Sequence, residues 1–168
     1  MGMRALYVTA DAVGAPTGGG AVTQNEFLAL QEAFGGTNVD LLSRAELTPW
    51  QYQGHDIPFL QDYFALSILR ARNLHFGVAH FYSGCFGQTV AYLRDRGTYV
   101  SYTVPAHDRQ ETIAEHRSLG MEYPYPHIGD DTLWERFSLG FRRADLVIAP
   151  SRLSAAFLKS QDCNNVVV

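Results

Sequence analysis

The chain has 168 residues, of which 46% are hydrophobic and 18% are charged, and its formal net charge is −4. This composition excludes a disordered chain and suffices for one domain with a hydrophobic core. The negative charge argues against a nucleic-acid-binding protein, which needs a basic surface, and no apolar run reaches the length of a membrane span.

The first predicted strand covers residues 5–11, and a glycine cluster, Gly18-Gly19-Gly20, follows it. We interpret this cluster as a loop. Residues 21–34 are predicted to form a helix, because apolar side chains recur along them with helical spacing. Glycines let a ligand approach the backbone, and a helix begins with unpaired N–H groups. Strand, glycine loop and helix therefore predict a phosphate or sugar site, with a plain flexible turn as the alternative.

The rest of the chain continues this alternation of strands and helices. Further strands are predicted over residues 38–42, 77–82, 98–104, 145–150 and 165–168, and helices over residues 59–73, 86–96 and 151–159. Two capping boxes, Thr112-x-x-Glu115 and Thr132-x-x-Glu135, each predict the start of another helix. Residues 45–58 are interpreted as a connecting loop.

Alternating strands and helices predict an α/β fold in which residues 1–168 form a single Rossmann-like domain. Its sheet is expected to be doubly wound and mostly parallel, with helices on both faces. Ligands bind at the carboxyl ends of the strands in such sheets, so we expect the residues found there to converge on one edge. These residues are Asp11 with the glycine cluster, Tyr82-Ser83-Gly84-Cys85, His107-Asp108 and Pro150-Ser151-Arg152.

Two of these strand ends carry recognisable chemistry. His107 has an imidazole that can hydrogen-bond a sugar hydroxyl and that titrates near neutral pH. The alternative is a histidine that caps the following helix or bonds the backbone. Ser83-Gly84-Cys85 opens a predicted helix, whose N–H groups are candidates for binding a phosphate or a hydroxyl, and a plain turn is the alternative.

The other histidines and cysteines predict no further site. His80 lies inside a strand and is interpreted as a core histidine with satisfied hydrogen bonds. Cys85 is interpreted as a small buried residue rather than a nucleophile. No histidine spacing matches a metal site, so no metal is expected. The wide separation of Cys85 and Cys163 favours a reducing compartment. We expect a cytoplasmic protein, with peripheral attachment to a membrane left open.

Three segments resemble, in this order, the large family 4 group of retaining glycosyltransferases with the GT-B fold. Residues 4–22 resemble the opening of these enzymes, residues 101–108 their strand that ends in a histidine, and residues 143–151 their "ADxVIxxS" segment. The resemblance covers nearly the whole chain. It implies two Rossmann-like domains facing across a cleft, of which this chain is the N-terminal, acceptor-side domain and the C-terminal donor domain is absent.

The resemblance also implies the reaction and its donor side. A sugar would pass from a nucleotide-sugar donor to an acceptor hydroxyl with retention at the anomeric carbon, without a cofactor or a metal. The donor would be held mainly by the second domain. Gly18, Gly19 and Gly20 would approach its diphosphate, and His107 would act as the catalytic residue beside the donor sugar. Residues 105–106 stand between the strand and this histidine, which departs from the family pattern.

On the acceptor side, the resemblance implies contacts from Tyr82, Ser83 and Asp108 to a sugar, a lipid or a small molecule. No nucleic-acid partner is expected. The chain alone is expected to be inactive, because half of the cleft is missing. Its exposed interdomain face is expected to associate with a second copy.

Two other functions stay open, namely a nucleotide-dependent oxidoreductase or epimerase on a Rossmann fold, and a non-catalytic binding domain of the same fold. The first is weakened because Gly14 and Gly18-Gly19-Gly20 do not have the G-x-G-x-x-G spacing of a dinucleotide site. Asp40 also lies within its predicted strand, whereas the ribose ligand of such enzymes stands at a strand end.

Overall fold

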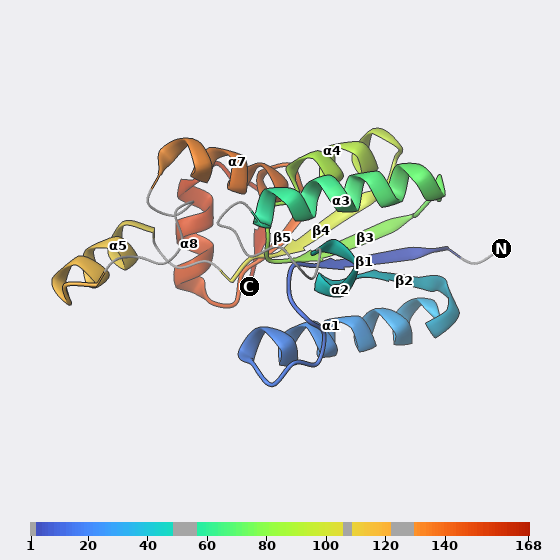
Figure 1. The fold of residues 1–168 in the computed structure, drawn as a ribbon, viewed down its shortest axis with the longest axis horizontal. Helices are drawn as coiled ribbons and strands as arrows, with labels where there is room; N and C mark the ends of the chain where they lie inside the picture. Colours follow the sequence, from blue (N-terminus) through green and yellow to red (C-terminus); the bar gives the residue numbers. More distant parts are fainter. Residues whose placement is uncertain (1–2, 49–56, 106–108, 122–129) are drawn as a thin grey trace.

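The computed structural model describes residues 3–48, 57–105, 109–121 and 130–168 (Figure 1). The strands are β1 (Ala5–Thr9), β2 (Val39–Leu42), β3 (Val78–Tyr82), β4 (Tyr99–Thr103), β5 (Leu146–Ile148) and β6 (Val166–Val167). The helices are α1 (Gly18–Phe34), the short 3₁₀ helix η1 (Gly36–Asn38), α2 (Arg44–Leu47), α3 (Ile57–Arg72), α4 (Gly87–Asp95), α5 (Arg109–Ser118), α7 (Asp131–Arg142) and α8 (Arg152–Ser160).

The six strands form one parallel sheet in the order β2-β1-β3-β4-β5-β6. The connection from β1 leads outward to β2, and every later connection leads the opposite way across the sheet. The strand order therefore reverses between β1 and β3, which is where doubly wound sheets bind ligands. The predicted α/β, Rossmann-like, doubly wound fold is confirmed.

Helices cover both faces of the sheet, but unevenly. Because parallel crossovers are right-handed, the outward connection places α1 on one face, while α3, α4 and α7 lie on the other (Figure 1). The face toward α3, α4 and α7 is apolar and fully packed. Its strand side chains include Leu6, Val8, Ala79, Phe81, Val100, Tyr102 and Val147, all buried.

The sheet face toward α1 has a different composition. Alternation along the strands turns Tyr7, His80, Tyr82, Ser101 and Thr103 to this face. Among the described residues, α1 is the helix that covers it, and it packs against β1 and β2. Polar side chains of β3 and β4 consequently line a part of the sheet that lies beside α1. We call the space between α1 and these strands the α1 groove.

The helix after β1 begins earlier than predicted. Gly18, Gly19 and Gly20 form the first turn of α1 rather than a loop, because the Thr17 hydroxyl accepts the Gly20 N–H at 3.0 Å and caps the helix. The apolar side chains that predicted this helix lie only in part on its inner face, where Phe27 and Leu30 are half-buried and Phe27 stacks on Tyr7. Gly20 and Thr23 are buried, whereas Val22 and Leu28 are exposed.

Two further elements differ from their predictions. A short helix, α2, takes up the first residues of the predicted loop, because Ser43 and Glu46 form a capping box and Leu47 packs into the core. For α7, the N-cap is Asp130, which accepts the Leu133 N–H at 2.9 Å, and not Thr132. No helix in the described ranges is long and apolar enough to cross a lipid bilayer.

Candidate functional site

Three groups meet at the carboxyl edge of the sheet, over the first turn of α1. A Cβ atom on Gly19 would lie 2.9 Å from Oδ2 of Asp11 and 3.8 Å from the hydroxyl oxygen of Tyr82. Asp11 follows β1, and Tyr82 is the last residue of β3, so both come from the point where the strand order reverses. The sequence predicts this convergence of strand ends, and the absent side chain of Gly19 leaves the space for it.

The backbone of Asp11 is held on both sides. Its N–H donates to Oγ1 of Thr9 at 3.0 Å, and its carbonyl accepts the N–H of Arg44 at 3.2 Å. Burial raises the pKa of the Asp11 carboxyl above its ordinary value, and the charge of Arg44 acts in the opposite direction. These bonds fix the backbone of Asp11, and its half-buried carboxyl lies beside the first turn of α1.

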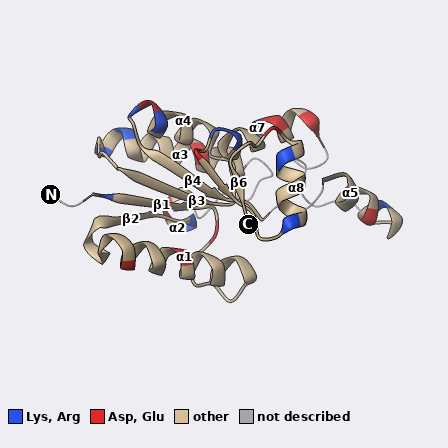
Figure 2. Cartoon of the chain, turned by 180° about the vertical axis from the view of Figure 1, so that it is seen from behind, with Lys and Arg blue, Asp and Glu red and all other residues tan. Residues whose placement is uncertain are grey.

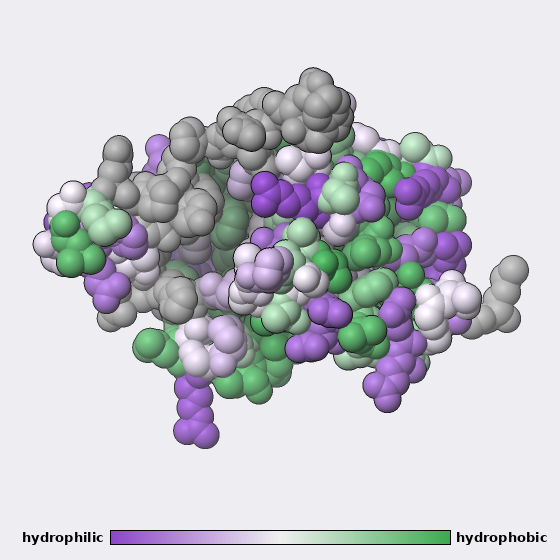
Figure 3. Space-filling view, turned by 60° about the horizontal axis from the view of Figure 1, so that its bottom comes forward, coloured by the Kyte–Doolittle hydropathy of each residue, from purple (hydrophilic) through white to green (hydrophobic). Residues whose placement is uncertain are grey.

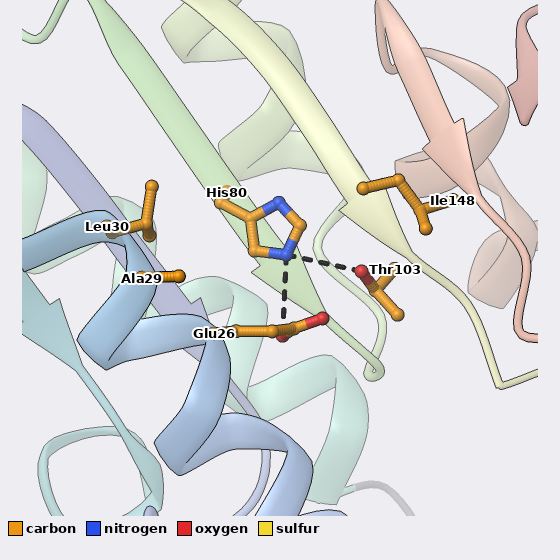
Figure 4. A pocket seen from close by; sticks show the side chains of 6 residues that line it. All are labelled: Glu26, Ala29, Leu30, His80, Thr103 and Ile148. Carbon is orange, nitrogen blue, oxygen red and sulfur yellow. Dashed lines mark hydrogen bonds and ion pairs between the residues drawn. The ribbon is translucent and has the colours of Figure 1, made fainter. Parts of the chain in front are cut away.

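Farther along the α1 groove, a hydrogen-bonded network joins the helix to three strands. Glu26 of α1 accepts a 2.8 Å hydrogen bond from the Tyr7 hydroxyl, and the same oxygen, Oε2, lies 3.4 Å from Nε2 of His80. His80 also bonds Thr103 through Nε2 at 3.2 Å (Figure 4). Its Nδ1 bonds Ser101 at 2.8 Å. The Tyr7 ring stacks on the His80 ring, with centroids 5.7 Å apart.

This network forms the floor of a pocket of about 260 Å³. The pocket is lined by Glu26, Ala29, Leu30, His80, Thr103 and Ile148 (Figure 4). Both ring nitrogens of His80 have partners and its side chain is buried, so the prediction of a satisfied core histidine is confirmed.

The network keeps Glu26 ionised. Burial alone would raise the pKa of its carboxyl, but hydrogen bonds from His80, Thr103 and Tyr7 and the charge of His80 outweigh burial, and the pKa lies below its ordinary value. The pKa of Tyr7 is raised, first by burial and then by the charge and the hydrogen bond of Glu26. The Glu26 carboxylate therefore accepts hydrogen bonds, and Tyr7 retains its proton.

We expect Glu26→Gln to make the free energy of unfolding less dependent on pH in the acidic range. A carboxyl whose pKa is lowered by folding stabilises the fold above its ordinary pKa of 4.5, and this contribution is lost as the pH falls through the folded pKa. The free energy of unfolding in urea should therefore fall less steeply between neutral pH and about pH 3 in the variant than in the wild type. Glu32→Gln, at an exposed position of the same helix, is the control, and equal flattening by this change would contradict the assignment.

The turn after β3 is strained and firmly held. Ser83 and Gly84 both have positive φ angles, of 55° and 80°. The Tyr102 hydroxyl donates to their carbonyl oxygens at 2.9 and 2.8 Å, and the Ser83 N–H donates to the Thr103 carbonyl at 3.1 Å. A non-glycine residue in this conformation is uncommon and persists where neighbouring contacts hold it. The half-buried Ser83 side chain is thereby kept next to Tyr82 at the carboxyl edge.

The N-terminus of α4 is occupied by the protein itself. The buried Asp62 carboxylate, on α3, accepts the N–H groups of Gln88 and Thr89, each at 2.9 Å, and the Thr89 hydroxyl at 2.7 Å. From the sequence, the N–H groups at the start of this helix are candidates for binding a phosphate or a hydroxyl. Since Asp62 already accepts them, they are not available to a ligand.

The structure brings some of the predicted site residues together and not others. Gly19 and Tyr82 lie beside Asp11, with Ser83 next in the chain. Gly18 is exposed at the start of α1, and Gly20 is buried against the backbone of Ala15. His107 and Asp108 lie outside the described residues, so their predicted roles stay predictions.

Ser151 and Cys85 both have structural roles. The Ser151 hydroxyl caps α8 by accepting the Ser154 N–H at 3.1 Å. Cys85 is buried, and burial raises the pKa of its thiol to about 12, which agrees with a packing residue rather than a nucleophile. Asp40 lies within β2 and not at the end of this strand. Its carboxylate forms an ion pair with Arg4 at 2.7 Å. In the part of the chain that the structure describes, no cluster of three metal-binding side chains occurs.

Sequence reasoning did not predict that Glu26, His80, Ser101 and Thr103 form a network in the α1 groove. A signal was present in the strands, where His80 and Tyr82, and likewise Ser101 and Thr103, alternate with apolar residues. Such alternation is typical of a strand with one polar face. Glu26 had no local signal, because its partners come from other strands.

The face that carries α1 is chemically mixed. Hydrophobic and hydrophilic side chains alternate over it and do not form one apolar patch (Figure 3). Helix α1 carries Glu26 and Glu32 and no lysine or arginine, while α8 includes basic residues, drawn in blue in Figure 2.

A scan against protein-family models finds no match for this chain, and a search of the curated proteins finds no similar protein. The chemistry of the site is therefore argued from its own residues. A carboxylate, a phenol hydroxyl and the N–H groups of a helix terminus make up the carboxyl edge, and each of these groups hydrogen-bonds hydroxyls.

Proposed function

We propose that this chain is the acceptor-side domain of a retaining glycosyltransferase of the GT-B type. The observation that carries the proposal is the meeting of Asp11, Gly19 and Tyr82 at the point where the strand order reverses. Sugar-handling sites of α/β proteins use this edge of the sheet. The three segments that resemble the family 4 enzymes add support, because they include β1, the carboxyl end of β4 and β5, and so lead to the same edge.

In this proposal, the chain positions the acceptor hydroxyl and helps to orient the donor. The acceptor oxygen forms a bond to the anomeric carbon, and the bond from that carbon to the nucleoside diphosphate breaks. The diphosphate departs with the electron pair of the broken bond and takes up the proton of the acceptor hydroxyl. Tyr82, Ser83 and Asp108 contact the acceptor, Gly18, Gly19 and Gly20 approach the diphosphate, and His107 orients the donor sugar. Catalysis then rests chiefly on positioning and on stabilising the leaving group, with the donor held mainly by a second domain.

A turnover assay on the full-length protein tests this function. Nucleoside-diphosphate sugars with uridine or guanosine are supplied with sugar and lipid acceptors, and release of the nucleoside diphosphate is followed. We expect release that depends on the acceptor, and a lower kcat for His107→Ala. His75→Ala, at an exposed position between α3 and β3, should match the wild type.

Two results would contradict the proposal. Full kcat and KM in His107→Ala would remove the role of that residue. Binding of a nicotinamide dinucleotide, with no turnover of any nucleotide sugar, would favour an oxidoreductase or epimerase. The ion pair between Asp40 and Arg4 argues against that alternative, because it engages the carboxylate that would otherwise be the candidate ribose ligand.

A further inference from the structure

The pocket in the α1 groove has apolar walls and opens to solvent. Ala29 and Leu30 of α1 lie on one side of it, and Ile148, the last residue of β5, lies on the other (Figure 4). Its volume of about 260 Å³ exceeds the roughly 150 Å³ of a cavity that holds a benzene ring. Because Ala29 is exposed, a ligand can enter along α1. The pocket therefore has room for a small organic molecule with an apolar body.

The polar floor of this pocket holds a carboxylate that can accept one more hydrogen bond. The Tyr7 hydroxyl donates to Oε2 of Glu26 at 2.8 Å, and Nε2 of His80 lies 3.4 Å from the same oxygen. Since a carboxylate only accepts, this nitrogen carries a ring proton. The Thr103 hydroxyl bonds Glu26 as well. A carboxylate has about four acceptor positions, so these internal donors leave one position for a ligand.

The charge of the pocket selects the class of ligand. Glu26 is ionised, and the described residues that line the pocket include no lysine or arginine. His80 is the one among them that can carry a positive charge, and it faces the oxygen that Tyr7 already contacts. An anion would be repelled by the carboxylate, and a neutral donor would form an ordinary hydrogen bond. A cationic donor forms a charge-assisted hydrogen bond, which is about twice as strong.

We infer that this pocket binds a primary ammonium group carried on a short apolar chain. The ammonium donates to the remaining acceptor position of Glu26, and the apolar chain packs between Leu30 and Ile148. Neither Asp11 nor Tyr82 lines this pocket, so the site is separate from the meeting point of strand ends at the carboxyl edge. The inference goes beyond the proposed function and does not depend on it.

The test is a titration of the isotope-labelled chain near neutral pH, followed through its amide signals, with three probes of equal chain length. Butylammonium is the cationic probe, 1-butanol is the neutral probe and butyrate is the anionic probe. We expect butylammonium to shift the signals of Ala29, Leu30 and Thr103. Butanol should bind about five- to tenfold more weakly, and butyrate should cause no shift at these residues.

Two variants of α1 separate the Glu26 carboxylate from the general charge of the helix. Glu26→Gln removes the charge and keeps the size of the side chain, so butylammonium should lose its advantage over butanol. Glu32→Gln removes an equal charge from an exposed position of the same helix and should keep that advantage. Ala29→Leu narrows the pocket from an exposed position and should weaken the binding of both probes about tenfold, the effect of about two CH₂ groups left unburied.

Urea unfolding checks that each variant is folded, and Ala29→Leu decides the question if Glu26→Gln does not fold. Equal affinity of the wild type for butylammonium and butanol would overturn the inference. The same would follow from equal losses in Glu26→Gln and Glu32→Gln, or from the absence of shifts at Ala29, Leu30 and Thr103. A failed turnover assay would remove only the proposed function, because the titration needs no sugar donor.

Discussion

Gly20→Ala is expected to lower the free energy of unfolding by about 2–3 kcal/mol. A Cβ atom at this position would lie 2.2 Å from the carbonyl oxygen and 2.6 Å from the nitrogen of Ala15. Both are backbone atoms, so no side-chain rotation relieves the contact. The loop before α1 must move, together with the hydrogen bond from the Gly14 N–H to the Gly20 carbonyl. Urea unfolding followed by circular dichroism measures the change.

Gly18→Ala is the matched control within the same turn. Nothing lies within 4 Å of a Cβ atom at Gly18, and the residue is exposed. Alanine favours a helix more than glycine does, so this variant should be as stable as the wild type or more stable by about 0.5–1 kcal/mol. Equal losses in both variants would mean that the packing of Gly20 on Ala15 does not hold the turn.

Asp62→Ala is expected to cost about 3 kcal/mol of unfolding free energy. The substitution removes the acceptor of the Gln88 and Thr89 N–H groups and of the Thr89 hydroxyl. Thr89 is fully buried, and water cannot replace the lost carboxylate there without opening the contact between α3 and α4. The measurement is again urea unfolding, with retention of the fold checked by circular dichroism.

Two comparisons separate the capping role of Asp62 from a general effect of charge removal. Asp62→Asn keeps one acceptor oxygen and should lose less stability than Asp62→Ala. Asp95→Ala removes an exposed carboxylate from the last turn of α4, the helix whose N-terminus Asp62 caps. An acidic group there opposes the helix dipole, so this change should cost almost nothing. A comparable loss in Asp95→Ala would contradict the assignment.

The elements of this fold could largely be predicted from local signals. The strands ending at Thr9, Tyr82 and Thr103 lie within the predicted runs, because short apolar segments between turn residues carry their own signal. The exceptions are also local. Helix α2 was not predicted, although Ser43 and Glu46 match the sequence pattern of a capping box. The start of α1 was not predicted because the glycines after Thr17 suggested a loop.

The candidate site could be predicted from the sequence only in part. The rule that strand ends share an edge was enough to nominate Asp11, the glycines and Tyr82. It did not reveal that Asp11 lies above Gly19, or that the helix N-terminus near Ser83 is closed by Asp62. Asp62 is 26 residues from Gln88 in the chain, and no local pattern links the two.

The sequence by itself determined the fold class, the alternation of strands and helices, and the set of strand ends, because these follow from periodicity and turn residues that act over a few positions. Only the tertiary structure decided which buried polar groups are satisfied. Glu26, His80 and Thr103 bond one another across α1, β3 and β4. Hydrogen bonding depends on distances between segments far apart in the chain, and those distances exist only once the sheet has formed.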